Sequence, residues 1–320
     1  MYPLKFYPVL KERLWGGTKL RDVLHKDIPS DITGESWELS GVEGDVSVVS
    51  NGEREGTSLK ELIAKQPVEL LGKSVYGRFG ESFPILIKFI DAKKDLSIQL
   101  HPNDELAKKR HNSFGKTEMW YVMDADADAE LIVGFNRDVS QNEYSKSLQK
   151  DTLTDLLNYE KVTEGDTFFI NTGKVHAIGA GVLLAEIQQT SDVTYRIFDF
   201  NRRDKNGNLR ELHTDLALEA IDYEKKADFR IDYDVAENKI NPMVDSPYFK
   251  TDYLKLDRNW EQDVSERDSF TILICVSGSA SVANEYGTVV LAKGETVLVP
   301  AVSERLEITT DMAVFLQVSI

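Results

Sequence analysis

Short runs of β-branched and aromatic residues make up much of this chain, and turn residues separate each run from the next. Such runs predict β-strands, because branched and aromatic side chains pack well on a pleated surface. Short strands with glycine turns are typical of jelly-roll barrels and sandwiches, so we predict a mainly β fold. The runs are Trp37–Ser40, Val46–Val49, Ile85–Ile90, Trp120–Met123, Glu130–Val133, Thr167–Ile170 and Val182–Gln188.

Three segments predict helices inserted into this β scaffold. Ser58–Glu61 and Ser140–Glu143 are capping boxes, in which a serine and a later glutamate satisfy the first amide groups of a helix. The second box opens a stretch that extends to Leu157. In 213–221 the apolar residues recur with a period near 3.6, which predicts a further helix.

The length of the chain predicts two domains. Its 320 residues are about twice the roughly 150 residues that one domain commonly occupies. The polar stretch 222–241 places the boundary near residue 240. We therefore expect a larger jelly-roll domain, 1–240, with helical insertions, followed by a smaller jelly-roll domain, 241–320.

The charge balance excludes some classes of partner. Lys and Arg number 38 against 54 Asp and Glu, which gives a net charge of −16. Long-range repulsion then disfavours nucleic acid and anionic membranes. A small phosphorylated substrate remains compatible with this acidity, because one site needs only a few local arginines and lysines.

Other features indicate a cytoplasmic protein without redox chemistry. No apolar run approaches the roughly 20 residues that span a bilayer, and the first residues lack the basic and apolar segments of a signal peptide. A single cysteine, Cys275, excludes a disulfide within the chain, and its apolar surroundings, 270–276, predict a core residue. The sequence gives no signal for an oligomeric state.

Potential metal ligands gather on strand faces in the first domain. Alternation along a strand puts Ser97, Gln99 and His101 on one face, and it puts Lys116 and Glu118 on a shared face. His176 follows a third strand, in a loop that can reach back to the mouth of a barrel.

We therefore predict a divalent metal site with ligands Gln99, His101, Glu118 and His176. Taken one at a time, a histidine or a carboxylate on a strand is more often a hydrogen-bonded or solvated residue than a ligand. Two imidazoles, a carboxylate and an amide oxygen suit one catalytic Zn²⁺ per chain, since structural zinc usually recruits several thiolates. Manganese and iron suit the same ligands.

A weak internal repeat limits this chemistry to the first domain. Segments 165–171 and 294–300 each contain a glycine, an acidic residue and a strand that ends at a loop. Eleven residues after the first glycine stands His176, whereas the same interval in the second copy leads to Arg305. No histidine follows His213, so the second domain is expected to lack metal ligands.

Four separated motifs resemble the type I mannose-6-phosphate isomerases, in particular their short bacterial branch. The motifs are 34–40 (GESWELS), 97–102 (SIQLHP), 115–121 (GKTEMWY) and 184–200 (LAEIQQTSDVTYRIFDF). The resemblance runs from Pro8 to about His213 and is much weaker after residue 240. It implies a cupin fold, a zinc site at the four ligands above, and an essential arginine at Arg196, and we expect the smaller second domain to be cupin-like.

The implied reaction interconverts mannose 6-phosphate and fructose 6-phosphate through an enediol, and it needs a base, a group that stabilises an oxyanion, and a phosphate contact. Candidates for the base are Glu186, a metal-bound water, and His176 if it is not a ligand. Arg196 suits the phosphate or the enediolate, and Lys116 suits a substrate oxygen. Ser97, Glu38 and Trp37 are expected to add substrate contacts.

Less specific interpretations of the same residues stay open. Glu186 could instead orient a ligating histidine or hold Arg196. Arg196 and Lys116 could both pair with neighbouring acids such as Asp192, Asp199 or Glu38. The segment 13–17 resembles a family motif, and we interpret it as a turn packed under the barrel. At the level of function, the alternatives are another metal-dependent cupin enzyme and a non-catalytic sugar-binding cupin.

Overall fold

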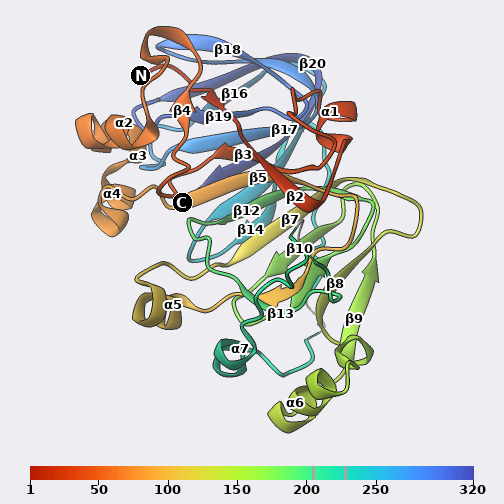
Figure 1. Ribbon diagram of the computed structural model, residues 1–320. Coiled ribbons are helices and arrows are strands. Elements are labelled where there is room, and N and C mark those ends of the chain that lie inside the picture. Colours follow the sequence, from red (N-terminus) through yellow and green to blue (C-terminus); the bar gives the residue numbers. More distant parts are fainter. Residues whose placement is uncertain (204–205, 227–228) are drawn as a thin grey trace.

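The computed structural model describes residues 1–203, 206–226 and 229–320, and it confirms a mainly β fold built from stacked sheets (Figure 1). Residues 227–228 of the polar stretch lie outside the described residues. A six-stranded antiparallel sheet occupies the middle of the stack. Its strands in order are β10 (Thr167–Ile170), β7 (Glu118–Ala125), β12 (Val182–Gln189), β5 (Ile85–Ala92), β3 (Thr33–Leu39) and β2 (Val9–Gly17).

A five-stranded sheet faces one side of the six-stranded sheet. Its strands in order are β13 (Tyr195–Phe198), β6 (Ile98–Leu100), β11 (His176–Ile178), β8 (Glu130–Phe135) and β9 (Leu157–Lys161). Among the described residues, neither sheet closes on itself, because its two end strands pair with one neighbouring strand each. The mainly β jelly-roll fold predicted from the sequence is therefore formed here by two open sheets packed face to face.

Strand alternation divides the six-stranded sheet into two chemically different faces. On β7, Trp120 and Val122 join the apolar layer between the two sheets, whereas Met119 and Tyr121 join the layer on the other side. The period of two that defines a β-strand therefore sorts neighbouring residues into separate cores.

Helices cover the outer face of the five-stranded sheet. Helix α6 (Gln141–Gln149), the 3₁₀ turn η2 (Leu153–Leu156) and α7 (Thr214–Ala220) bury Tyr144 and Ala217 against this sheet. Helix α6 begins after Ser140, whose side chain accepts a hydrogen bond from the Glu143 amide, as predicted. The helix ends well before Leu157, which opens strand β9 instead, so the predicted extent of this helix is wrong.

Helices also line the opposite side of the six-stranded sheet, beside β1 (Phe6–Tyr7) and β4 (Val48–Val49). The capping box at Ser58 is complete, with Glu61 as the reciprocal partner. Here α2 (Leu59–Lys65) and α3 (Pro67–Leu71) contribute leucines to the core, and α4 (Lys73–Phe79) contributes Val75. Short elements elsewhere are α1 (Lys19–Asp22), η1 (Gly52–Arg54) and α5 (Asp104–His111).

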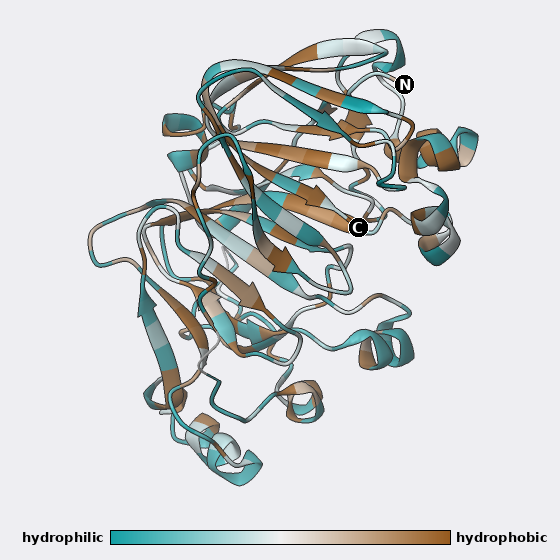
Figure 2. Ribbon diagram, turned by 180° about the vertical axis from the view of Figure 1, so that it is seen from behind, coloured by the Kyte–Doolittle hydropathy of each residue, from teal (hydrophilic) through white to brown (hydrophobic). Residues whose placement is uncertain are grey.

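The third large sheet comprises the C-terminal strands and packs its face on the same core. Its strands are β14 (Ile240–Asp245), β15 (Lys250–Leu256), β20 (Arg305–Ser319), β17 (Thr271–Asn284) and β18 (Gly287–Ala292), with β16 (Trp260–Asp263) paired to β20 and β19 (Thr296–Val299) paired to β17. Ile272 and Leu316 meet Ile87 and Met119 of the six-stranded sheet in one continuous core. Figure 2 shows hydrophobic colour along the strands of the stacked sheets and much hydrophilic colour on the peripheral helices.

The internal repeat has the same local geometry in both copies. Gly165 and Gly294 adopt φ of +93° and +84°, which only glycine adopts without steric cost. Each glycine precedes a strand of four residues, β10 or β19.

Candidate active site

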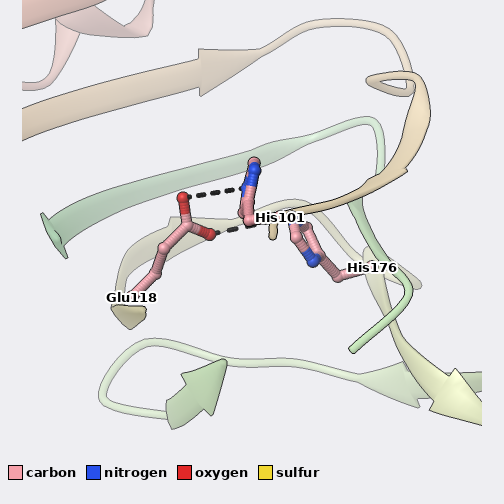
Figure 3. Close-up of side chains that lie close together, drawn as sticks. All are labelled: His101, Glu118 and His176. Atoms are coloured by element: carbon pink, nitrogen blue, oxygen red, sulfur yellow. Dashed lines mark ion pairs between the residues drawn. The ribbon is translucent and has the colours of Figure 1, made fainter. Parts of the chain in front are cut away.

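Three strand ends bring His101, Glu118 and His176 together between the two facing sheets (Figure 3). His101 follows β6, Glu118 begins β7 and His176 begins β11. One ligand atom from each side chain lies within 4.8 Å of the others, and each residue is 1% exposed. This cluster contains three of the four predicted ligands.

The donor atoms of this cluster fit a divalent cation. The Nδ1 atoms of His101 and His176 contact the backbone carbonyls of Val193 and Lys174 at 2.9 and 2.8 Å, so each ring presents Nε2 to the centre. His101 Nε2 and both oxygens of Glu118 are buried without a hydrogen-bond partner among the described residues. Burial lowers the pKa of His101 to about 4 and also lowers the pKa of His176, so both rings are neutral at neutral pH and can donate a lone pair to a metal.

The predicted fourth ligand, Gln99, lies beside the cluster. It stands opposite His176 on one side of β6 and opposite Arg196 on the other. Its Nε2 lies 3.5 Å from His176 Nε2, and its Oε1 lies 3.4 Å from Ser97 Oγ. Rotation of the side-chain amide would turn the oxygen toward the cluster, so Gln99 stays a predicted ligand.

Lys116 extends the cluster toward the substrate side. Its Nζ lies 3.0 Å from Glu118 Oε1, as strand alternation predicted for these two residues. Burial lowers the pKa of this ammonium, but the charges of Glu118 and Glu186 outweigh burial and raise it. Lys116 is therefore a buried, charged ammonium next to the metal ligands.

A cavity of about 410 Å³ opens onto this cluster. Charged side chains of both signs line it, and aromatic rings form part of its wall. The size is suited to a small molecule rather than a polymer. Its lining includes Arg13, Trp15, Glu35, Trp37, Lys88, Ser97, Gln99, Lys116, Trp120, His176, Glu186, Asp192, Arg196 and Arg210.

Glu186 lines the cavity and is held by two donors. Lys88 Nζ donates to its Oε1 at 2.8 Å, and Trp120 Nε1 donates to its Oε2 at 3.0 Å. The alternative roles, orienting a ligating histidine or holding Arg196, do not match these contacts.

Arg196 reaches the same cavity from β13. Its Nε donates to Ser97 Oγ at 3.3 Å and its Nη1 donates to the Glu211 carbonyl at 2.9 Å. The predicted alternative, an ion pair with Asp192, Asp199 or Glu38, is absent from the described part of the chain.

The two substrate contacts predicted on β3 lie on opposite faces of the strand. Trp37 lines the cavity, whereas Glu38 pairs with buried Lys26 at 2.7 Å on the far side of the sheet and does not line it. Glu35, which shares the face of Trp37, lines the cavity instead and accepts a hydrogen bond from Trp37 Nε1 at 2.8 Å. Neighbouring strand residues point apart, so Trp37 and Glu38 cannot both reach one cavity.

The segment 13–17 is part of strand β2, not a turn under the barrel. Arg13 and Trp15 line the cavity, and Arg13 Nη2 lies 2.9 Å from Glu35 Oε2. The sequence signal was the alternation of long polar and aromatic residues at Lys11, Arg13 and Trp15.

The cavity residues that the sequence analysis missed include Lys88, Trp120 and Arg210. A lone lysine inside the apolar run Ile85–Ile90 was a signal for Lys88, because an unpaired charge is costly in a buried strand. Trp120 was predicted to lie on a strand but not to line the site. Arg210 lies in an irregular segment, and nothing in the local sequence singles it out.

Two observations bear on other predictions. Cys275 is buried, and burial raises its pKa to about 12, as expected for a core thiol rather than a nucleophile. Within the described ranges, no helix combines the length and apolarity that crossing a membrane requires.

Two family models of mannose-6-phosphate isomerases together match most of the chain. The family model for the catalytic domain of type I phosphomannose isomerases matches residues 4–135, and the model for the cupin domain of mannose-6-phosphate isomerases matches residues 239–318. The second match shows that similarity also covers the C-terminal region, where the sequence motifs showed only a weak resemblance.

Relatives and solved structures extend the similarity to nearly the whole length. The chain is 35% identical to mannose-6-phosphate isomerase ManA of Bacillus subtilis over 93% of both chains, and 33% identical to mannose-6-phosphate isomerase of Streptococcus mutans over 93% and 92%. The crystal structure of mannose 6-phosphate isomerase from Bacillus subtilis covers 100% of both chains with a TM-score of 0.89 and 34% identity.

Proposed function

The chain belongs to the type I phosphomannose isomerase family, and we propose that it interconverts mannose 6-phosphate and fructose 6-phosphate at one zinc ion held by His101, Glu118, His176 and Gln99. The observation that carries this proposal is the buried His-Glu-His cluster, in which His101 Nε2 and both Glu118 oxygens accept no hydrogen bond among the described residues and His176 lines a cavity of about 410 Å³. Two imidazoles, a carboxylate and an amide favour zinc over the harder cations. When bound, the metal supplies Lewis-acid polarisation of the substrate oxygens.

The cavity residues supply the remaining requirements of the reaction. In the direction from mannose 6-phosphate, Glu186 takes the proton from C2 while O1 gains a proton, which gives the enediol. The O2 hydroxyl then gives up its proton, which balances the proton gained by O1, as the C2 carbonyl forms and Glu186 returns its proton to C1. Lys88 and Trp120 each occupy one lone pair of its oxygens, which fixes the carboxylate and leaves a further lone pair on each oxygen.

Positive charge surrounds the reacting end of the substrate. Lys116 places an ammonium where negative charge develops on a substrate oxygen during enolisation. Arg196 presents guanidinium N–H groups to the phosphate, and Ser97 and Trp37 complete the wall beside it. Each predicted site residue therefore has a proposed role except Glu38, which lies outside the cavity.

We also propose that 1–240 forms the catalytic unit and that 241–320 is a cupin-like unit without metal ligands. The start of β14 at Ile240 and the lack of histidine after His213 support this division. The cytoplasm is the proposed location, because a charged sugar phosphate does not cross a bilayer unaided.

The test is a coupled assay for conversion of mannose 6-phosphate to fructose 6-phosphate, with metal content measured on the same preparation. We expect about one zinc per chain, loss of turnover on treatment with EDTA, and recovery on addition of Zn²⁺. Turnover that survives complete metal removal would contradict the metal assignment. A metal-loaded protein that binds the sugar phosphate without turnover would favour the non-catalytic sugar-binding cupin.

A further inference from the structure

Most of the positive side chains that line the catalytic cavity have a carboxylate partner of their own. In such a pair, the carboxylate compensates the charge and competes with any substrate anion. The pairs are Lys11 with Asp45, Arg13 with Glu35, Lys88 with Glu186, and Lys116 with Glu118.

Arg196 and Arg210 differ from these four residues. Arg196 donates only to neutral oxygens, those of Ser97 and of the Glu211 backbone, in the part of the chain that the structure describes. Arg210 Nη1 lies 3.3 Å from Asp199 Oδ1, but that oxygen also pairs with Arg202.

The positive charge left over around these arginines favours an anion such as a phosphate monoester. Arg196, Arg202 and Arg210 carry three positive charges, and Asp199 offsets one of them. This leaves about two positive charges on the arginines and one negative charge on Asp192 of the cavity wall, a positive surplus that attracts a phosphate of about −1.5 to −2 at neutral pH. Of these arginines only Arg196 and Arg210 line the cavity, since Arg202 donates to Asp199 and to the backbone of Asp95.

The two guanidinium groups are close together and partly removed from water. Burial, and then the charge of Arg210, lower the pKa of Arg196, and burial lowers the pKa of Arg210. The backbone oxygen that accepts from Arg196 belongs to Glu211, the residue next to Arg210. Arg210 is 27% exposed at its side chain, so an anion in the cavity can reach it.

The distance of this pair from the metal ligands suits a hexose phosphate. Arg196 stands opposite Gln99, and Gln99 stands opposite His176, so two strand spacings separate Arg196 from a ligand. Two spacings amount to roughly 10 Å, about the reach of a six-carbon chain that carries a phosphate at its far end.

We propose that Arg210 binds the phosphate of the substrate together with Arg196 and makes the cavity selective for phosphorylated over free sugar. The inference rests on the proposed function, because that function supplies the phosphorylated substrate.

The test compares Arg210→Ala and Arg210→Lys with the wild-type holoenzyme. KM and kcat are measured for mannose 6-phosphate, and inorganic phosphate serves as a competitive inhibitor. Arg210→Ala should raise KM and the inhibition constant of phosphate about 10- to 100-fold, with kcat changed less than about threefold, since a lost hydrogen bond to a charged group weakens binding by that factor. Arg210→Lys keeps the charge and should recover part of both effects.

A matched control removes one positive charge elsewhere. Arg137 is exposed and pairs with Glu143 on the surface, and Arg137→Ala should leave both constants unchanged. Unchanged constants in Arg210→Ala, measured on an active enzyme, would overturn the inference and leave the proposed function intact. Loss of phosphate binding in Arg210→Ala, measured by calorimetry on a protein with no isomerase turnover, would support the phosphate site and reject the proposed function.

Discussion

The loops that follow β10 and β19, in the two copies of the repeat, differ in chemistry although the copies share one backbone conformation. Gly165 and Gly294 both adopt positive φ before a four-residue strand. Beyond the first copy, His176 is buried and faces Glu118. At the same interval beyond the second copy, Arg305 is exposed and pairs with Glu261 on the surface.

The interiors of the two regions explain the difference. The facing sheets leave a polar end with a cavity, whereas the C-terminal sheet closes around leucines, valines and Phe315. One backbone element therefore supports either a reactive centre or an apolar core, depending on which side chains point inward. The following predictions test that contrast, beginning with the largest expected effect.

Replacing a metal ligand should abolish the chemistry of the first region. His101→Ala should lose bound metal and lower turnover about a thousandfold or more, because the charge stabilisation that a metal supplies amounts to several kcal/mol. Elemental analysis and the coupled assay check both effects. His25→Asn, at an exposed histidine with φ of +57°, is the control and should keep both. Full metal content in His101→Ala would count against the ligand set.

Replacing the cavity arginine should separate binding of metal from turnover. Arg196→Ala should fold and keep its metal but lose about 100- to 1000-fold in kcat/KM, because a preorganised cation is lost from a partly buried site. Arg305→Ala is the matched control in the second region and should retain wild-type kinetics, since exposed ion pairs contribute little. Near-normal activity in Arg196→Ala would contradict the role proposed for Arg196.

Truncating the apolar core of the second region should affect stability and not chemistry. Phe315 is fully buried, so Phe315→Ala should lower the free energy of unfolding by about 3–5 kcal/mol in urea titrations. The kcat of the folded fraction should not change. A lower kcat at urea concentrations below the unfolding transition would show that the second region contributes to the site.

The smallest effects should come from the two glycines. A Cβ at Gly294 would lie 2.8 Å from Leu24 Cβ, whereas a Cβ at Gly165 would meet nothing nearer than the Tyr233 hydroxyl at 3.6 Å. Gly165→Ala should therefore cost about 1 kcal/mol from backbone strain alone, and Gly294→Ala should cost more. Thermal melting of both variants measures the difference, and equal costs would show that the neighbours of Gly294 adapt freely.

Local patterns were sufficient to predict much of the fold and the centre of the site. Alternation predicted that Leu184, Glu186 and Gln188 share a face, and the capping box at Ser58 marked the start of α2. The same rule was not applied to Trp37 and Glu38, which adjacent strand positions send to opposite faces.

What local patterns could not predict depends on contacts between distant segments. Arg210 reaches the cavity because the segment that follows it is bonded to β13. The amide of His213 donates to the carbonyl of Arg196. The open arrangement of the sheets likewise depends on long-range strand pairing, which the period of any one strand does not encode.

The pairing of Leu4 with Leu298 has a consequence for biosynthesis. Each residue donates its amide to the carbonyl of the other, at 2.8 and 2.9 Å, so the segment around Leu4 is fixed by a strand that is translated much later. The ribosome adds roughly 5–20 residues per second, so the apolar face that later receives Ile272 and Leu316 stays uncovered for several seconds. During that interval the nascent protein presents a surface that chaperones recognise, and slow codons between residues 240 and 298 would lengthen its exposure to aggregation.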